Sequence, residues 1–231
     1  MSLVTFELRE NIAVIGLDDG KANALSHALM DAVDEAFTRA EREASAVVLV
    51  GRKGRFSAGF DLGEMMGGKE RVYAMITRGA DFLLRAYALP VPLIVACTGH
   101  ALAGGALLVL TGDVRVAARG AFRIGLNEVQ IGLPVPVLAM ELARDRLSPL
   151  HLTAATLFAN IVDPDGALAA GWVDELASEE GLLEAAMVHA RRLSALPREA
   201  YAKTKTSLRE RTIEYVRGTL AADLKRLTPG S

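Results

Sequence analysis

Two segments of the chain consist largely of small residues and could bind an anion through backbone N–H groups. The first, Gly-Arg-Phe-Ser-Ala-Gly-Phe-Asp-Leu, covers residues 54–62, and the second, Gly-His-Ala-Leu-Ala-Gly-Gly-Ala, covers residues 99–106. Each follows an apolar segment and precedes a helical pattern, and the first N–H groups of a helix lack acceptors within it. Two such groups converging on one point would stabilise a developing oxyanion. Taken singly, each segment is more typical of an ordinary glycine-rich turn.

Several other catalytic patterns are absent from the sequence. It contains neither the phosphate-binding Gly-x-x-x-x-Gly-Lys-Ser/Thr motif nor a Gly-x-Gly-x-x-Gly motif after the first expected strand. Ser57 does not lie in the Gly-x-Ser-x-Gly motif of many hydrolases. Because Cys97 is the single cysteine and the histidines are scattered, we expect no disulfide within the chain and no metal site.

The composition is that of an ordinary globular protein. The 231 residues suit one large domain, with 51% apolar and 23% charged residues. A formal net charge of −2 gives no broad basic field, so we expect no nucleic-acid partner. The first ten residues do not resemble a signal peptide, and no apolar stretch is long enough to span a bilayer. We therefore expect a soluble, cytoplasmic protein that does not bind membranes.

Alternating segment types predict an α/β fold with mostly parallel strands. Residues 4–8 and 12–17 alternate around Glu10 and Asn11, which predicts two strands joined by a tight turn. Apolar residues recur at helical spacing after Ser26, a favourable N-cap, so we expect an amphipathic helix over residues 26–43. Further strands are expected at residues 46–50, 93–97, 114–117 and 122–124, with helices at residues 70–88 and from residue 105 to about 111.

The C-terminal part of the chain is expected to be mainly helical. Residues 172–176 could form a last strand, and amphipathic patterns predict helices over residues 181–194, 197–209 and 212–227. Such a region suits packing against the core or against another subunit. Since no linker or low-complexity tract separates the parts, we expect one unit: a core of residues 1–170 and a helical region of residues 171–231 that serves oligomerisation.

Four motifs in order resemble those of the crotonase (enoyl-CoA hydratase/isomerase) superfamily. Two are Phe-Ser-Ala-Gly-Phe-Asp-Leu at residues 56–62 and Ala-Gly-Gly at residues 103–105. The others are Gly-Lys-Ala-Asn-Ala-Leu at residues 20–25, similar to the family's coenzyme-A-binding turn, and Ala-Gly-Trp-Val-Asp-Glu at residues 170–175. The resemblance covers nearly the whole chain, and four motifs together are far more specific than one.

The resemblance implies a spiral of repeated strand–strand–helix turns, followed by a helical trimerisation region. It implies an oxyanion hole formed by the backbone N–H groups of Phe60 and Gly104, and an acyl-CoA thioester as substrate with no separate cofactor. A homotrimer, or a dimer of trimers, is implied as the assembly. The substrate-binding residues would be Lys21, Ala22, Ala24, Ala58, Asp61, Leu62 and Leu107.

One carboxylate, Glu128, is predicted to be the acid–base group. Family members that hydrate a double bond resemble one another in having two glutamates, and this chain has Leu107 where the first would lie. Hydration needs water to be held and deprotonated while a carbon is protonated, which one carboxylate does poorly. Moving a double bond from C3–C4 to C2–C3 needs only one base. Gly-Leu-Asn-Glu at residues 125–128 is also similar to the Δ3,Δ2-enoyl-CoA isomerases.

The sequence thus favours isomerisation of 3-enoyl-CoA to trans-2-enoyl-CoA in fatty-acid oxidation. Apolar neighbours such as Leu107 and Leu133 predict a raised pKa for Glu128. Pro136 replaces a residue with an N–H group that could hold water in the hydratases. Two alternatives stay open: hydration or another crotonase-type reaction on an acyl-CoA, and a catalytically silent acyl-CoA-binding protein.

Overall fold

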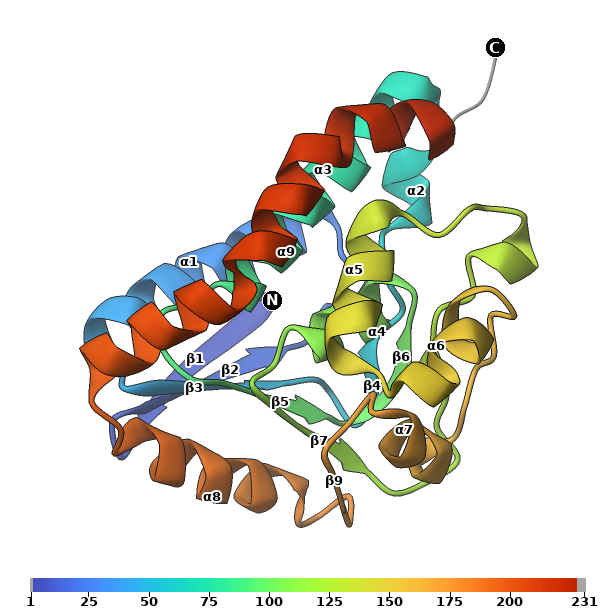
Figure 1. The fold of residues 1–231 in the computed structure, drawn as a ribbon. Coiled ribbons are helices and arrows are strands. Elements are labelled where there is room, and N and C mark those ends of the chain that lie inside the picture. The colour runs from blue at the N-terminus through green and yellow to red at the C-terminus, as the bar shows by residue number, and fades with distance from the viewer. Residues whose placement is uncertain (1, 228–231) are drawn as a thin grey trace.

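Two sheets of unequal size form the framework of the molecule (Figure 1). The structure is a computed structural model, which describes residues 2–227. The larger sheet contains, in spatial order, β1 (Val4–Arg9), β2 (Ile12–Leu17), β3 (Ala46–Val50), β5 (Leu93–Cys97), β7 (Val114–Ala118) and β9 (Glu175–Ala177). The smaller contains β4 (Gly54–Ser57), β6 (Gly99–Leu102) and β8 (Ile124–Gly125). β1 pairs antiparallel with β2, and the other neighbours pair parallel, as predicted.

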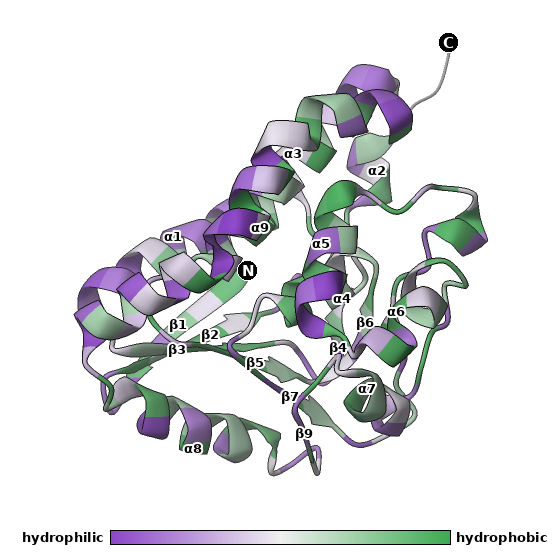
Figure 2. Ribbon diagram, in the orientation of Figure 1, coloured by the Kyte–Doolittle hydropathy of each residue, from purple (hydrophilic) through white to green (hydrophobic). Residues whose placement is uncertain are grey.

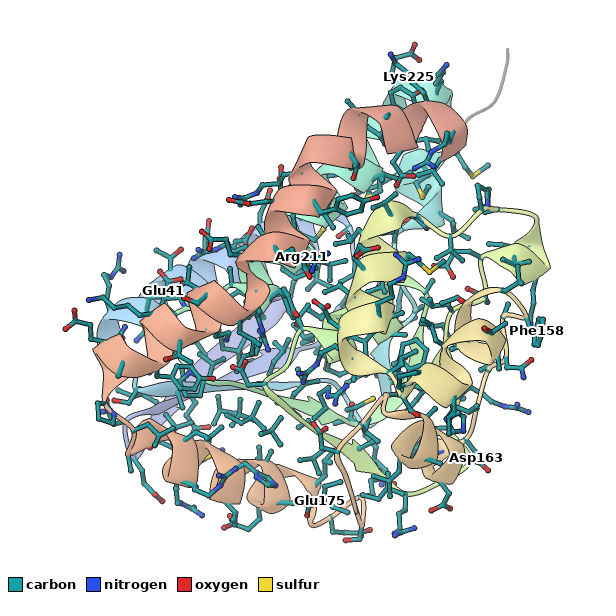
Figure 3. All side chains as sticks on the ribbon, viewed as in Figure 1. Glu41, Phe158, Asp163, Glu175, Arg211 and Lys225 are labelled. Atoms are coloured by element: carbon teal, nitrogen blue, oxygen red, sulfur yellow. The ribbon has the colours of Figure 1, made fainter. Side chains whose placement is uncertain are left out.

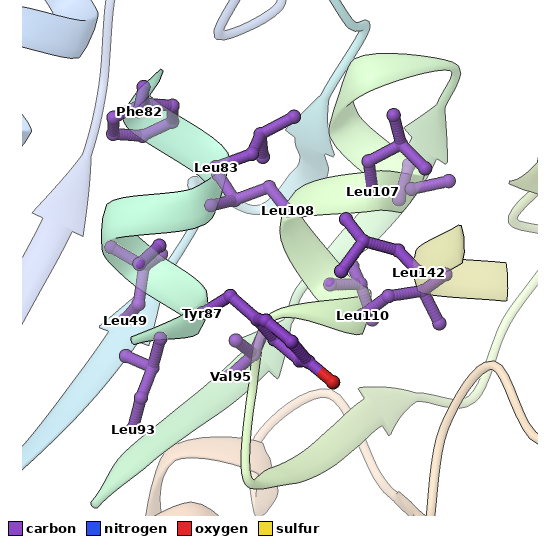
Figure 4. Packing of buried hydrophobic residues seen from close by; sticks show 14 of the residues in the cluster. Leu49, Phe82, Leu83, Tyr87, Leu93, Val95, Leu107, Leu108, Leu110 and Leu142 are labelled. Atoms are coloured by element: carbon purple, nitrogen blue, oxygen red, sulfur yellow. The ribbon is translucent and has the colours of Figure 1, made fainter. Parts of the chain in front are cut away.

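Helices cover both faces of the larger sheet, which explains its uninterrupted apolar strands. Val47 and Leu49 belong to the main core, whereas Ala46 and Val48 pack with the apolar face of α8 (Leu182–Ser194) on the opposite side (Figures 1, 2 and 4). The main core is covered by α1 (His27–Glu43), α3 (Lys69–Tyr87), α4 (Gly104–Leu110), α5 (Val137–Arg146) and α9 (Arg198–Leu227). Shorter helices are α2 (Leu62–Met65), α6 (Pro149–Thr156), α7 (Pro164–Ala170) and a 3₁₀ turn, η1 (Val129–Ile131). None of the helices within residues 2–227 is long and apolar enough to cross a membrane.

The N-terminal predictions are confirmed by local geometry. Glu10 and Asn11 both have positive φ, 49° and 64°, which a two-residue turn of this hand requires. Ser26 caps α1, because its hydroxyl accepts a hydrogen bond from Leu29 N at 3.1 Å. Local signals were sufficient here, since the turn and the cap act within a few residues.

The smaller sheet corrects the prediction for the two small-residue segments. Residues 54–57 and 99–102 form β4 and β6, which pair parallel, where loops were expected. Glycine-rich strands of four residues have little propensity of their own, so only their pairing reveals them. Each follows a strand of the larger sheet and leads to a helix. This gives the repeated strand–strand–helix turns of the expected spiral.

The C-terminal region differs from the prediction in two places. The helices expected at residues 197–209 and 212–227 are one helix, α9, and the last strand lies at Glu175–Ala177, later than expected. Polar residues on the buried side of α9, among them Lys205 and Arg209, obscure its apolar periodicity. Both pair with Asp113, at 2.7 Å each. α9 therefore packs on the core partly through buried charges.

We predict that Asp113→Ala destabilises the fold strongly, because it leaves the two buried cations of α9 unpaired. Asp113 also accepts a hydrogen bond from Leu93 N at 2.7 Å, so the free energy of unfolding should fall by about 3–5 kcal/mol. Urea unfolding measures this. The control is Asp165→Ala, which removes an exposed pair with Arg119 and should cost at most about 1 kcal/mol. Equal losses for the two variants would contradict the prediction.

Candidate active site

The backbone N–H of Phe60 is left available by the way its segment pairs with Leu25. Leu25 donates to the Gly59 carbonyl at 2.8 Å and accepts from Asp61 N at 3.3 Å. In a parallel bridge of this kind the residue between these two partners directs its own N–H away from the neighbouring strand. Gly59 has a φ of 92°, which favours glycine and turns the chain at this point.

The second predicted donor, the N–H of Gly104, belongs to the first residue of α4, so it has no acceptor within the helix. Ala103 before it has φ 48° and ψ −123°, a strained conformation for a residue with a Cβ. The Ala103 N–H donates to the Gly125 carbonyl at 3.0 Å, which helps to hold the turn. The segments of Phe60 and Gly104 approach closely, since a Cβ on Gly59 would lie 3.1 Å from Gly104 N.

A mostly apolar cavity of about 300 Å³ lies beside these segments. Five of the predicted site residues line it: Ala58, Phe60, Leu62, Leu107 and Glu128. Leu107 lies on α4 and is buried, so the position that would carry the first glutamate of a hydratase presents an apolar side chain to the cavity. Pro136, which has no N–H group, is part of the wall as well.

Glu128 is placed by a tight turn at the start of η1. Its carbonyl accepts hydrogen bonds from Ile131 N at 3.1 Å and Leu133 N at 2.9 Å. Its Oε2 is buried and, among the described residues, has no hydrogen-bond partner. Burial raises the pKa of the carboxyl, although the N–H groups of Glu128 and Asn127 oppose the shift. The predicted direction of this pKa shift is confirmed, and a raised pKa suits a group that exchanges protons with a substrate.

The turn expected to bind coenzyme A lies next to the cavity but does not line it. Ala58 N donates to the Ala22 carbonyl at 3.0 Å, which joins this turn to the cavity wall. The Asp19 carboxylate accepts from Lys21 N at 2.7 Å and Ala24 N at 3.1 Å, so the turn is held from within. The side chain of Lys21 is exposed.

Asp61 has a structural contact that the sequence did not indicate. Its carboxylate caps α2 by accepting from Gly63 N at 2.8 Å and Glu64 N at 3.3 Å. Leu62, the first residue of this helix, lines the cavity although it is 66% exposed, so it lies where the cavity meets solvent.

Sequence reasoning missed the walls that two long helices supply. α3 contributes Val72, Ile76 and Ala80, and α9 contributes Leu220, Asp223 and Leu227. No motif covers these residues, yet their spacing of three or four could have marked one face of each helix. The structure therefore brings residues as distant in sequence as Ala58 and Leu227 into one cavity. Within residues 2–227, no group of three or more His, Cys, Asp or Glu side chains could hold a metal ion.

Comparison with known proteins gives one consistent family. The family model described as enoyl-CoA hydratase/isomerase matches residues 7–228. The mitochondrial enoyl-CoA delta isomerase 1 of Homo sapiens is 30% identical, over 91% of this chain and 71% of its own length. A solved enoyl-CoA hydratase/isomerase family protein from Pseudomonas syringae is 36% identical, with a TM-score of 0.95 over 98% of both chains. The apo structure of an enoyl-CoA isomerase from Mycobacterium tuberculosis is 37% identical, with a TM-score of 0.91 over 96% of this chain and 99% of its own.

The fold is thus that of a crotonase-type enzyme. The chain belongs to the enoyl-CoA hydratase/isomerase family.

We predict that Gly79→Ala destabilises the protein, because the ring of Phe60 packs directly on Gly79 of α3. An added Cβ would lie 2.2 Å from Phe60 Cε1, so the ring must move, at a cost of about 1–3 kcal/mol in the free energy of unfolding. The control is Gly218→Ala on α9, where nothing lies within 4 Å, and there alanine should stabilise by about 0.5–1 kcal/mol. In a Phe60→Ala background, Gly79→Ala should lose its penalty. A stabilising Gly79→Ala would contradict the packing described.

We predict a pH-dependent stability difference between the wild type and Glu128→Gln. Because burial raises the folded-state pKa of Glu128, its stabilising contribution is complete below the unfolded-state pKa and is lost as pH rises through the folded value. The variant should therefore melt a few degrees higher than wild type at about pH 8, with the difference shrinking toward about pH 4. The exposed Glu35, replaced by Gln, is the control and should show no such trend. A pH-independent difference would be inconsistent with the prediction.

Proposed function

We propose that this enzyme converts 3-enoyl-CoA to trans-2-enoyl-CoA in fatty-acid oxidation, with Glu128 as its single base. One observation carries the proposal: the Glu128 carboxyl is buried with one oxygen that lacks a hydrogen-bond partner among residues 2–227, in a cavity whose wall has Leu107 in place of a second glutamate. A lone carboxylate in apolar surroundings suits proton transfer between neighbouring carbons, and it is poorly equipped to hold and activate water.

The proposed reaction proceeds in two proton transfers. Glu128 removes a proton from C2 of the 3-enoyl thioester, and the electron pair moves into the carbonyl to give a dienolate. The backbone N–H groups of Phe60 and Gly104 donate to the negatively charged oxygen and lower the barrier to its formation. Protonated Glu128 then returns the proton to C4 as the C2–C3 double bond forms. The base is thereby regenerated, and the reaction needs no cofactor.

The substrate's two ends would be bound by different parts of the site. The acyl part would occupy the cavity, against Ala58 and Leu107. The coenzyme A part would lie over Leu62 and the adjacent turn. There the exposed Lys21 would pair with its phosphates, and the backbone of residues 22–24 would bind its adenine. Asp61 would contribute by holding α2, and with it Leu62, in place.

We further propose that the protein assembles as a homotrimer, or as a dimer of trimers, in the cytoplasm. Large apolar side chains are exposed around α6, including Leu150 at 90%, Leu157 at 63% and Phe158 at 62%, the last lying at the periphery in Figure 3. Such a concentration of exposed apolar side chains supports a protein interface. These side chains lie in the core of residues 1–170, whereas α9 of region 171–231 lines the cavity of its own chain.

The test is an assay of 3-enoyl-CoA and 2-enoyl-CoA side by side with one enzyme preparation. We expect isomerisation of the former and hydration of the latter at least about 100-fold slower. Glu128→Gln should lower kcat by about 10²–10⁴-fold, whereas the exposed control Glu35→Gln should leave it unchanged. Because the base must be ionised and burial raises its pKa, kcat/KM should rise with pH through a value above that of an ordinary glutamate.

Three outcomes would overturn the proposal in different ways. Efficient hydration with 3-enoyl-CoA untouched would establish the hydratase alternative. Tight acyl-CoA binding without turnover of either substrate would establish the silent binding protein. Full turnover by Glu128→Gln would remove Glu128 from the mechanism of any reaction at this site.

A further inference from the structure

The last turns of α9 form a wall of the cavity that no motif in the sequence indicates. Leu220, Asp223 and Leu227 share one face of the helix, and all three line the cavity. Facing residues come from α3 and α5, including Ile76 and Leu138. Among the described lining residues Glu128 and Asp223 carry the only ionisable side chains, and the rest of this wall is apolar. An apolar pocket closed by a helix fits a hydrocarbon chain.

Asp223 is bound where α5 begins. The side chain is only 4% exposed, and its Oδ2 accepts a hydrogen bond from Val137 N at 2.7 Å. α5 has no side-chain cap of its own, because Pro136 occupies the N-cap position. A carboxylate that is distant in sequence therefore supplies the cap, which the helix dipole favours. The other oxygen, Oδ1, pairs with Arg226 at 3.0 Å. With both oxygens engaged, Asp223 is not placed to act as a base.

The polar contacts that join α9 to the core before Asp223 lie well away from the cavity. Lys205 and Arg209 pair with Asp113, and the Thr212 hydroxyl donates to Asp145 at 2.6 Å. From Thr212 to Asp223 the helix advances about 16 Å. Val216 packs in the main core between these two points, and Asp223 supplies the polar contact at the end that lines the cavity.

We propose that Asp223 is a positioning residue that fixes α9 against α5 and thereby sets which acyl-chain lengths the cavity accepts. The proposal rests on the proposed function in one respect, which is that the ligand is an acyl-CoA. With Asp223 in place, Leu220 and Leu227 contact the distal part of the chain. Short acyl groups, which reach only to Glu128 and the oxyanion donors, do not depend on this wall.

The test compares the Kd values of acetyl-, butanoyl-, hexanoyl- and octanoyl-CoA, measured by calorimetry, for the wild type and variants. A buried methylene should improve affinity by up to about fourfold. Asp223→Leu, which keeps the branched shape but is bulkier and cannot accept a hydrogen bond, should weaken octanoyl-CoA binding by about 10-fold or more and leave acetyl-CoA within about twofold. Asp223→Asn, whose amide oxygen can still cap α5, should restore most of the preference.

Two further variants separate a specific role from a loss of stability. Asp163→Ala removes a comparable cap, since Asp163 Oδ1 accepts from Gly166 N at 2.8 Å at the start of α7, away from the end of α9 (Figure 3). It should leave the chain-length profile unchanged. Leu220→Trp fills the part of the cavity beside α9 and retains Asp223. It should reduce octanoyl-CoA binding by about 10-fold with little effect on acetyl-CoA.

Two results would overturn the inference: an equal loss for all chain lengths in Asp223→Leu, or an unchanged profile in Leu220→Trp. Saturated acyl-CoAs cannot be isomerised, so a wild-type protein that binds them but does not isomerise 3-enoyl-CoA would refute the proposed function alone. A wild-type protein that binds none of the four would refute both.

Discussion

Burying a carboxyl group in mostly apolar surroundings is the constraint that the rest of this site must satisfy. Oε2 of Glu128 has no hydrogen-bond partner among residues 2–227 and shares a cavity with side chains such as Leu107. The charged form of the carboxyl therefore loses hydration that the N–H groups of Glu128 and Asn127 replace only in part. A protein tolerates such a group only if the surrounding segments are held firmly by other interactions. The closed turn of η1 and the α4 helix, which lies wholly in the core, meet this condition.

The spiral brings the segments of Phe60 and Gly104, the proposed backbone donors, to the cavity that holds this carboxyl by repeating one unit. β4 and β6 pair side by side, so the turns that follow them are brought into contact, and residues without large side chains permit the approach of Gly59 to Gly104. The strain at Ala103 is local, and the hydrogen bond to the Gly125 carbonyl links its turn to the strand that leads to Glu128. The donors and the carboxyl therefore belong to three successive turns of one framework.

Local patterns predicted the parts of the fold that local interactions determine. The hairpin at Glu10, the cap at Ser26 and the buried strands depend on residue type and on periods of two or 3.6. The motifs predicted that Glu128 and Leu107 belong to one site, and both residues line the cavity. The α9 wall was harder to predict, because Leu220, Asp223 and Leu227 have the spacing of one helix face but Asp223 resembles a solvated residue until its buried partner is known.

The polar contacts of α9 also explain how a long helix keeps a defined position on an apolar surface. An apolar helix face can pack in registers that differ by a turn, about 5.4 Å, with modest differences in buried area. Such a shift in α9 would carry Leu220 away from the cavity. It would also separate Lys205 from Asp113 at one end and Asp223 from Val137 N at the other, leaving buried charged groups unpaired. The charges thus select one register, and the shape of the cavity follows from that register.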